Sequence, residues 1–378
     1  MKKIGLTVLL ASILATGLLV ACESGTGNAN NNNNNVGNND DTLTFIEKAD
    51  YDLSDEEAGV LLLGRVEGDV QSIIAVKGDE SKNITRNASK KDGELAVDKE
   101  LMQGLSAGVW TFTVTTDETT YVSEVTVATY ILSDYYEFRD FHTATKNGAT
   151  ATADWYVLLD GDINASDSAT GSRMLGNGKW CSFNGVFDGR GHTISNLQAN
   201  RYLFRYVNGT IQNVAFTDYT QYGTLHEEYA CFVEQGTGTI KNVYFQASVP
   251  EDSFVAFTGL KIENVVLDMT YTGATPTHVL FGGDESNLMM ADNALSPAYT
   301  SDNIYVIAKS QVENGEVYFS RLYRETNGSY FAVHSQEEVY LSSKMLVNRR
   351  NQDGKMFDGS KGWSKYWNIV DGDVAFGK

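Results

Sequence analysis

The chain has few prolines, few cysteines and a shortage of positive charge, and each shortage narrows the classes of protein it can belong to. Its 378 residues include three prolines and 35 glycines, a ratio that favours regular β-structure with tight turns over extended linkers. Its 29 basic residues are outnumbered by 49 acidic ones, which gives a formal net charge of −20. Nucleic acids and anionic lipid surfaces bind basic patches, so we expect neither a nucleic-acid partner nor electrostatic docking on a membrane.

The three cysteines, Cys22, Cys181 and Cys231, have no zinc-site spacing. The last two form either one disulfide or two buried free thiols, and the sequence leaves both alternatives open. The five histidines are scattered, with no pair at ligand spacing, and neither a nucleophile-elbow motif nor a phosphate-binding loop occurs. We therefore predict no metal, no cofactor and no catalytic residue.

Two acidic segments are candidate sites of metal binding or catalysis. Residues 160–164 (Asp-Gly-Asp-Ile-Asn) match the first half of a calcium loop, but Ala165 and Gly171 replace the glycine and glutamate that the loop requires. Residues 227–228 and Glu234 form an acidic group in a long loop, for which a solvated surface is favoured over a catalytic pair.

The amino terminus carries the strongest localisation signal. Lys2 and Lys3 precede an uncharged apolar run, Ile4–Val20, which ends in Leu-Val-Ala-Cys at residues 19–22. This ending resembles the lipobox of bacterial lipoproteins. The resemblance implies a signal peptide over residues 1–21, cleavage after Ala21 and lipid attached to Cys22, hence an anchored protein exposed outside the cytoplasm. The alternative is an uncleaved membrane anchor, but the run is slightly shorter than the ~20 residues of a span.

Residues 22–42 follow as a predicted tether. The segment from Gly25 to Asp41 is rich in glycine and asparagine and contains six consecutive asparagines. Such a composition buries no apolar surface, so we expect a flexible connection rather than a folded element.

Residues 43–130 are predicted to form a small β-sandwich. Residues 110–115 alternate large apolar side chains with threonines, which is the period of a strand with one buried face. Further apolar runs at 60–63, 73–76 and 121–127 are separated by turn residues. Several short strands at this spacing resemble an immunoglobulin-like module of the kind without a disulfide.

A repeat begins after residue 155. Four segments read x-Ile-x-Asn-(Leu/Val), and their asparagines are Asn196, Asn213, Asn242 and Asn264. A phenylalanine lies 9, 9, 10 and 10 residues before the respective asparagines, whereas the asparagines themselves are 17, 29 and 22 residues apart. Constant inner spacing with variable outer spacing predicts fixed strands joined by loops of different length.

This pattern favours a right-handed parallel β-helix, in which each coil stacks ~4.8 Å above the last. Inward isoleucine and phenylalanine would form an apolar core, and asparagine would occupy sharp corners because it tolerates left-handed backbone geometry. We predict that the four asparagines form a structural ladder with amides hydrogen-bonded along the column. The alternative is coincidence in an ordinary β-sandwich with Asn-containing turns.

The segment 183–194 (Phe-Asn-Gly-Val-Phe-Asp-Gly-Arg-Gly-His-Thr-Ile), with residues 203–204 and 209–214, resembles the pectate-lyase-like β-helix repeats of bacterial surface proteins, including GLUG-type repeats. The resemblance is clearest over 155–267 and implies an all-β fold with residues 131–378 as the β-helix. Asp188 belongs to the recurring turn, for which a structural role is expected. A short capping helix is predicted over 133–141, with Ser133 as its N-cap.

A complete repeat without a recognisable catalytic cluster favours a non-catalytic surface lipoprotein that binds glycan or another surface protein. Relatives of the fold include polysaccharide lyases and glycoside hydrolases, so an extracellular enzyme of that kind is the alternative, and a scaffold without ligand is a third. Tyr219, Tyr222 and Tyr229 mark a candidate ligand loop, since exposed aromatics suit sugar stacking or protein contact. Alternatively, these tyrosines pack between the loop and the side of the β-helix.

Overall fold

The computed structural model describes residues 44–147, 152–167, 175, 181–199, 202–221, 232–250, 260–272, 300–312, 315–323, 357, 359–371 and 373–377. These residues belong to one compact unit, Thr42–Lys378. They are mostly β-strand, as the sequence predicts, with two α-helices, α1 (Lys99–Gln103) and α2 (Tyr135–Ala144), in the described part. No helix among them is long and apolar enough to cross a membrane. The predicted signal peptide, Cys22 and nearly all of the predicted tether lie outside the described residues.

The first two sheets share one core. One has the order β1 (Lys48–Asp52), β8 (Thr120–Ala128), β7 (Gly108–Thr116), β3 (Val70–Lys77), β4 (Glu80–Asn83), and the other β2 (Leu61–Arg65), β6 (Glu94–Val97), β5 (Ala88–Lys91). The alternation predicted for residues 110–115 is present in β7, where Trp110, Phe112 and Val114 are fully buried. Residues of both sheets join these three in a single cluster.

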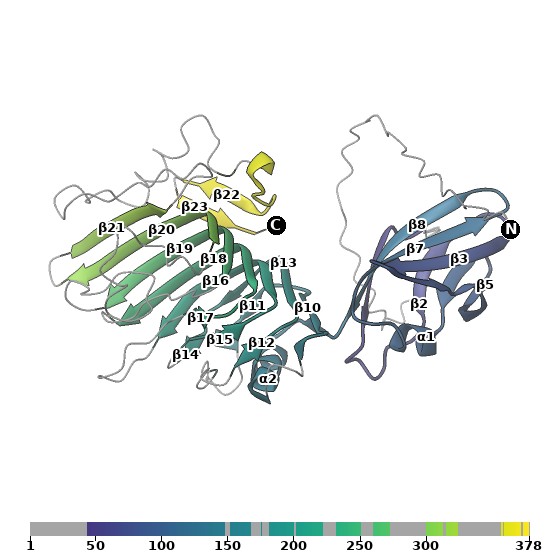
Figure 1. Ribbon diagram of the computed structural model, residues 1–378, viewed down its shortest axis with the longest axis horizontal. Helices are drawn as coiled ribbons and strands as arrows, with labels where there is room; N and C mark the ends of the chain where they lie inside the picture. Colours follow the sequence, from purple (N-terminus) through teal and green to yellow (C-terminus); the bar gives the residue numbers. More distant parts are fainter. Residues whose placement is uncertain are drawn as a thin grey trace, which may run out of the picture. The chain divides into compact units, whose positions relative to one another are not determined.

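From β9 to β20 the strands of the main sheet are parallel and stacked (Figure 1). The main sheet runs through β9 (Tyr130–Leu132), β10 (Tyr156–Leu159), β13 (Val186–Ser195), β16 (Thr210–Gln221), β18 (Thr239–Pro250), β19 (Lys261–Thr272), β20 (Thr300–Val312) and the antiparallel β21 (Gly315–Tyr323). Two short strands, β11 (Ile163–Asn164) and β14 (Gln198–Ala199), pair with β13 and β16.

A second parallel sheet contains β12 (Ser182–Phe183), β15 (Phe204–Val207) and β17 (Val233–Gln235). Along the sequence the chain passes alternately through this sheet and the main one, so that β12, β15 and β17 are followed by β13, β16 and β18. Each such pass is called a coil below, and the assembly of coils is called the stack.

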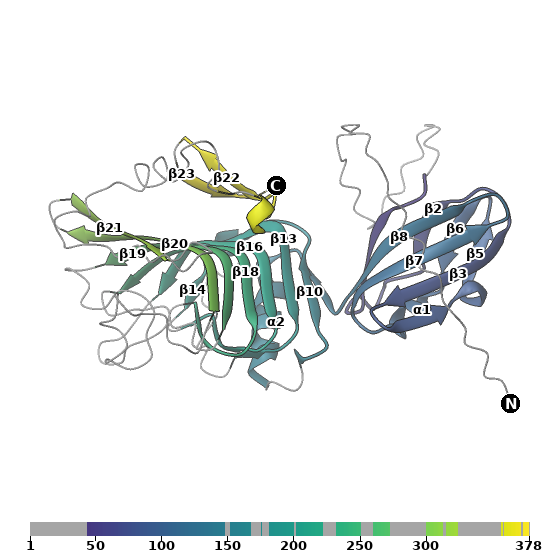
Figure 2. The same cartoon turned by 45° about the horizontal axis from the view of Figure 1, so that its top comes forward.

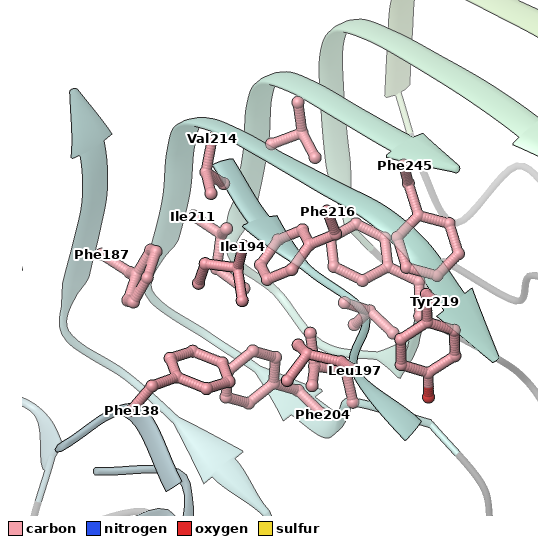
Figure 3. Packing of buried hydrophobic residues seen from close by; sticks show 14 of the residues in the cluster. Phe138, Phe187, Ile194, Leu197, Phe204, Ile211, Val214, Phe216, Tyr219 and Phe245 are labelled. Atoms are coloured by element: carbon pink, nitrogen blue, oxygen red, sulfur yellow. The ribbon is translucent and has the colours of Figure 1, made fainter. Parts of the chain in front are cut away.

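Equivalent side chains of successive coils form columns inside the stack. Phe187, Ile211 and Ile240 occupy one register position and are buried. Phe216 and Phe245 occupy another, with ring centroids 6.4 Å apart, and Figure 3 shows both rings pointing into the same core. Burying each such side chain contributes roughly 1.5–3 kcal/mol, so the columns stabilise the stack.

A corner between two arms interrupts the four strands β13, β16, β18 and β19. Asn213, Asn242 and Asn264 occupy this corner with φ of 53°, 51° and 55°. The flanking residues confirm one shared position, because Gln212, Lys241 and Glu263 are register partners on one side of the corner. Left-handed geometry costs asparagine less than most residues, which accounts for its recurrence.

Asn196 does not belong to this column, which corrects the predicted ladder of four. Ile194 pairs with Phe216, and the Asn196 amide donates to the Thr217 carbonyl, so Asn196 lies at the next corner, near Asp218. In its coil the first corner is formed instead by Gly-Arg-Gly at 189–191, where Arg190 has φ of 53°. The sequence motif of the repeat is present in this coil, but its isoleucine, Ile194, lies in the second arm of the strand rather than the first.

Helix α2 packs its aromatic face into the core of the first coils. Phe138 and Phe141 are buried, and the Phe138 ring lies 6.4 Å from that of Phe187 (Figure 3). The N-cap is Asp134 rather than Ser133, because the Asp134 side chain accepts from the amides of residues 136 and 137. Ser133 instead donates its amide to the Glu137 carboxylate, completing the capped turn.

The carboxyl end forms a small antiparallel hairpin of β22 (Trp367–Val370) and β23 (Asp373–Phe376). The described residues from 357 to 377 are called the C-terminal strap. Figure 2 shows the hairpin lying over strands of the main sheet. Two tryptophans of the strap, Trp363 and Trp367, share a cluster with Ala215, Tyr244 and Val266 on the outer side of that sheet.

Candidate functional site

The outer side of the first arm carries a column of polar residues. Asp188, Gln212, Lys241 and Glu263 are register partners on four successive strands. They face outward because side chains alternate along a strand, and the residue before each in the first three strands is buried in the core. These four residues are called the outer polar column.

The Asp188 side chain stabilises the turn in which it lies. Its carboxylate accepts hydrogen bonds from Gln212 Nε2 (2.8 Å), Asn213 Nδ2 (3.1 Å) and the Arg190 amide (2.9 Å). Three donors on one carboxylate fix both the corner of its own coil and that of the next. The arrangement fits the structural role predicted for this turn.

Glu263 is held by two lysines. Lys241 Nζ lies 3.6 Å from its carboxylate, and Lys261 forms a closer ion pair. Burial opposes ionisation, but the hydrogen bond and charge of Lys261, with the charge of Lys241, outweigh it and lower the pKa of Glu263. Glu263 is therefore ionised at neutral pH and is poorly suited to donate a proton.

Next to the column, Arg190 and Tyr156 form a partly buried pair of polar groups. Arg190 donates to both carboxylate oxygens of Asp50, each at 2.5 Å. Burial, reinforced by the charge of Asp188, raises the pKa of Tyr156 to about 12. The phenol thus stays protonated at neutral pH and acts as a hydrogen-bonding group rather than a base.

A histidine and a cysteine meet inside the core, but not in a reactive arrangement. His142 Nε2 lies 2.7 Å from the Leu203 carbonyl, so that nitrogen carries a proton and cannot accept one from Cys181 Sγ, 3.5 Å away. Burial lowers the pKa of His142 to about 4 and raises the pKa of the Cys181 thiol. Cys181 is a buried free thiol, and Cys231 lies outside the described residues.

Tyr219 is a core residue, which corrects its assignment to a ligand loop. It is fully buried, with its ring 5.2 Å from that of Phe245 (Figure 3). The register shifts between Phe216 and Tyr219 at Asp218, where φ is 50°, and this irregularity turns the tyrosine inward. Tyr222 and Tyr229 lie outside the described residues.

The described residues of the two candidate acidic segments form contacts between coils. Asp162 accepts from the Thr193 amide (2.9 Å) and lies 3.1 Å from His192 Nδ1. Glu234 pairs with Arg205 at 3.0 Å, whereas residues 227–228 lie outside the described ranges. Within those ranges no group of three or more histidine, cysteine and acidic residues is placed to hold a metal ion.

A polar ladder that the sequence analysis missed lies at the corner before the first arm. Asn208 Nδ2 donates to Asn184 Oδ1 (3.0 Å), and Asn208 Oδ1 accepts from the Thr237 amide (3.1 Å). A glycine follows each of the three, at 185, 209 and 238. The recurring Asn-Gly or Thr-Gly pair indicates this corner in the sequence, but the pairs are unevenly spaced and are therefore hard to recognise as a repeat.

Comparison with known proteins adds little. No family model matches the chain, and no curated protein matches it. Among solved structures, an IgA1 Protease aligns with 76% of this chain at 8% identity and a TM-score of 0.18. The chain spans about a third of that structure (34%).

Proposed function

We propose that this chain is a lipid-anchored bacterial surface protein whose folded part binds glycan or another surface protein without catalysis. The outer polar column carries the proposal. Its donors and acceptors are held in fixed positions by the stack and repeat at the ~4.8 Å strand spacing. A rigid, periodic row of polar groups loses little freedom on binding and suits an extended, repetitive ligand.

The parallel stack is, in this proposal, a right-handed parallel β-helix. Support comes from the alternation between two parallel sheets and from the shared corner of Asn213, Asn242 and Asn264. The handedness rests on the general rule that crossovers between parallel strands are right-handed. The preceding two-sheet module, with fully buried Trp110, is proposed to be an immunoglobulin-like spacer.

Binding is favoured over catalysis because the polar groups on this side of the stack are poor proton carriers at neutral pH. The pKa of Glu263 is lowered and that of Tyr156 is raised to about 12. Asp188 already accepts three hydrogen bonds, one from its own corner and two from the next coil. Catalysis of glycosidic cleavage needs an acid and a base whose pKa values are matched to the working pH.

The anchoring part of the proposal rests on the amino-terminal residues alone. The basic start, the apolar run and Ala21-Cys22 support lipid attachment at Cys22 and exposure at the cell surface. Metabolic labelling with a fatty acid would test it, with Cys22→Ser as the matched variant. Label on the parent chain and none on the variant is expected, and equal labelling of both would contradict the assignment.

The ligand proposal is tested with soluble protein from residue 43 onward on a panel of glycans and surface proteins, scoring retention and product release together. We expect retention without turnover. The double variant Gln212→Ala/Lys241→Ala should weaken retention by about tenfold or more. Lys91→Ala, at an exposed position of β5 in the preceding two-sheet module, is the control and should leave retention unchanged. Turnover of any polymer would support the lyase or hydrolase alternative instead.

A further inference from the structure

The second arm of the main sheet has an apolar column on its outer side. Ala215, Tyr244 and Val266 are register partners on β16, β18 and β19. Their neighbours Val214, Val243 and Val265 belong to the core, so this column faces the opposite way. It is nonetheless almost fully buried, with exposed fractions of 1%, 7% and 0%. An apolar column on an outer face needs a cover.

The cover is the aromatic cluster of the C-terminal strap. The Trp367 ring lies 6.3 Å from that of Tyr244, and it also packs against Trp363, Phe357 and Phe376 at 4.9–5.0 Å. Trp363 and Trp367 are 4% and 7% exposed. Large aromatic side chains buried at the centre of a contact are the usual source of its binding energy.

Asn242, a corner residue of the stack, provides a polar anchor for the strap. Asn242 Oδ1 accepts from the Ser364 amide (3.1 Å) and from Trp367 Nε1 (3.3 Å). The neighbouring corner residue Asn213 donates instead to Asp188, although both have the same left-handed backbone. Asn242 is therefore distinguished from its equivalent in the previous coil by its contact with the strap.

The strap is attached through side chains rather than by extending the sheet. The two strands β22 and β23 pair with each other in a separate sheet. The further backbone hydrogen bonds described for the strap, from the amides of Gly362, Trp367 and Gly377, are also internal to it. A self-contained hairpin that docks in this way resembles a bound ligand more than an added strand of the stack.

We propose that the apolar column and Asn242 form a docking site for a tryptophan-bearing hairpin, and that the C-terminal strap is its built-in, displaceable ligand. The same segment supplied as a separate peptide then binds this face whenever the attached strap is weakened. The inference does not depend on the glycan-binding proposal, because peptide binding and hydrogen exchange of the strap are measured without any glycan.

The test uses the full-length chain with Trp363→Ala/Trp367→Ala and a labelled peptide of residues 357–378. The peptide should bind this variant at least about tenfold more tightly than the wild-type chain, whose own strap occupies the face. Adding Asn242→Gly should weaken peptide binding by about tenfold, whereas Asn213→Gly should change it by less than about threefold. Binding to neither chain, equal binding to both, or equal losses from the two glycine variants would overturn the proposal.

A second measurement covers the case in which the double tryptophan variant fails to fold. Glycine retains the positive φ at either corner, so both single variants preserve the backbone. In the full-length chain, hydrogen exchange over residues 359–377 should accelerate by about tenfold in Asn242→Gly and remain near wild type in Asn213→Gly. Equal acceleration in the two, or none in Asn242→Gly, would show that the strap is not held through Asn242.

Discussion

Asn208 donates a hydrogen bond from Nδ2 to Oδ1 of Asn184, its counterpart one coil earlier, over 3.0 Å. The glycines that follow the two asparagines bring the backbones of the coils unusually close. A Cβ placed on Gly209 would lie 1.9 Å from the Gly185 carbonyl oxygen. This corner therefore requires glycine for close approach, and it fixes the vertical spacing of the coils.

Gly209→Ala should destabilise the protein strongly, by about 3 kcal/mol or more, because the clash is with backbone that cannot move alone. The control is Gly161→Ala, whose added Cβ would have no atom within 4 Å. We expect that variant to stay within about 0.5 kcal/mol of wild type. Chemical denaturation of both variants decides the matter, and a Gly209→Ala curve that overlays wild type would refute close packing at this corner.

Asn213→Leu should cost about 1–3 kcal/mol through the lost hydrogen bond to Asp188. The left-handed backbone at this corner adds about 1–2 kcal/mol for a residue with a bulky side chain. Asn213→Gly removes the same hydrogen bond but accepts the backbone geometry, so its loss should be smaller. The order of the two melting temperatures is the readout, and a leucine variant as stable as the glycine variant would contradict the assignment.

Tyr219→Ala should lower the free energy of unfolding by about 3–5 kcal/mol, because it empties a fully buried position beside Phe245. Val122→Ala, at a position that is 52% exposed, provides the matched surface truncation. If Tyr219 were instead a ligand contact on an open loop, its truncation would reduce retention on the ligand panel and leave the unfolding curve in place.

Acid should destabilise the fold through His142. The unfolded chain takes up a proton near the ordinary histidine pKa of 6.5, whereas the buried ring does so only at about 4. Between these values the unfolded state binds more protons, so the free energy of unfolding falls as pH falls, by at most about 1.4 kcal/mol per pH unit and about 3 kcal/mol in total. Denaturation midpoints measured across this range test the slope.

His142→Gln supplies the control for the pH effect. The amide retains a donor for the Leu203 carbonyl but does not titrate, so the difference between the two stability profiles isolates the histidine. We expect the variant profile to be flatter between pH 6.5 and 4. Parallel profiles would mean that His142 is solvated in the native state.

The sequence predicted the corner of the coils correctly for three asparagines, but it misplaced Asn196 and Tyr219. The bend at Asn213, Asn242 and Asn264 was predictable because left-handed geometry selects asparagine residue by residue. Asn196 was misplaced because its coil fills the first corner with Gly-Arg-Gly, so the repeated letters fall one corner later. A one-residue irregularity at Asp218 likewise reversed the facing of Tyr219.

The contacts of the C-terminal strap could not be predicted from local sequence patterns. Trp367 begins β22 of the strap. Its partner Asn242 lies 125 residues away, however, and nothing in the repeat separates Asn242 from Asn213. Which corner the strap contacts is a property of the assembled stack.

The register of the stack underlies the outer polar column, the corners and the docking face, and one cross-linking experiment tests it most directly. In a background with the native cysteines replaced by alanine, Gln212→Cys/Lys241→Cys joins register partners one strand apart, at the ~4.8 Å spacing that a disulfide spans. Gln212→Cys/Glu263→Cys joins the same column two strands apart, about twice that distance. We predict that only the first pair oxidises to a disulfide in the native protein. Formation of the second without the first would contradict the stacked-coil account.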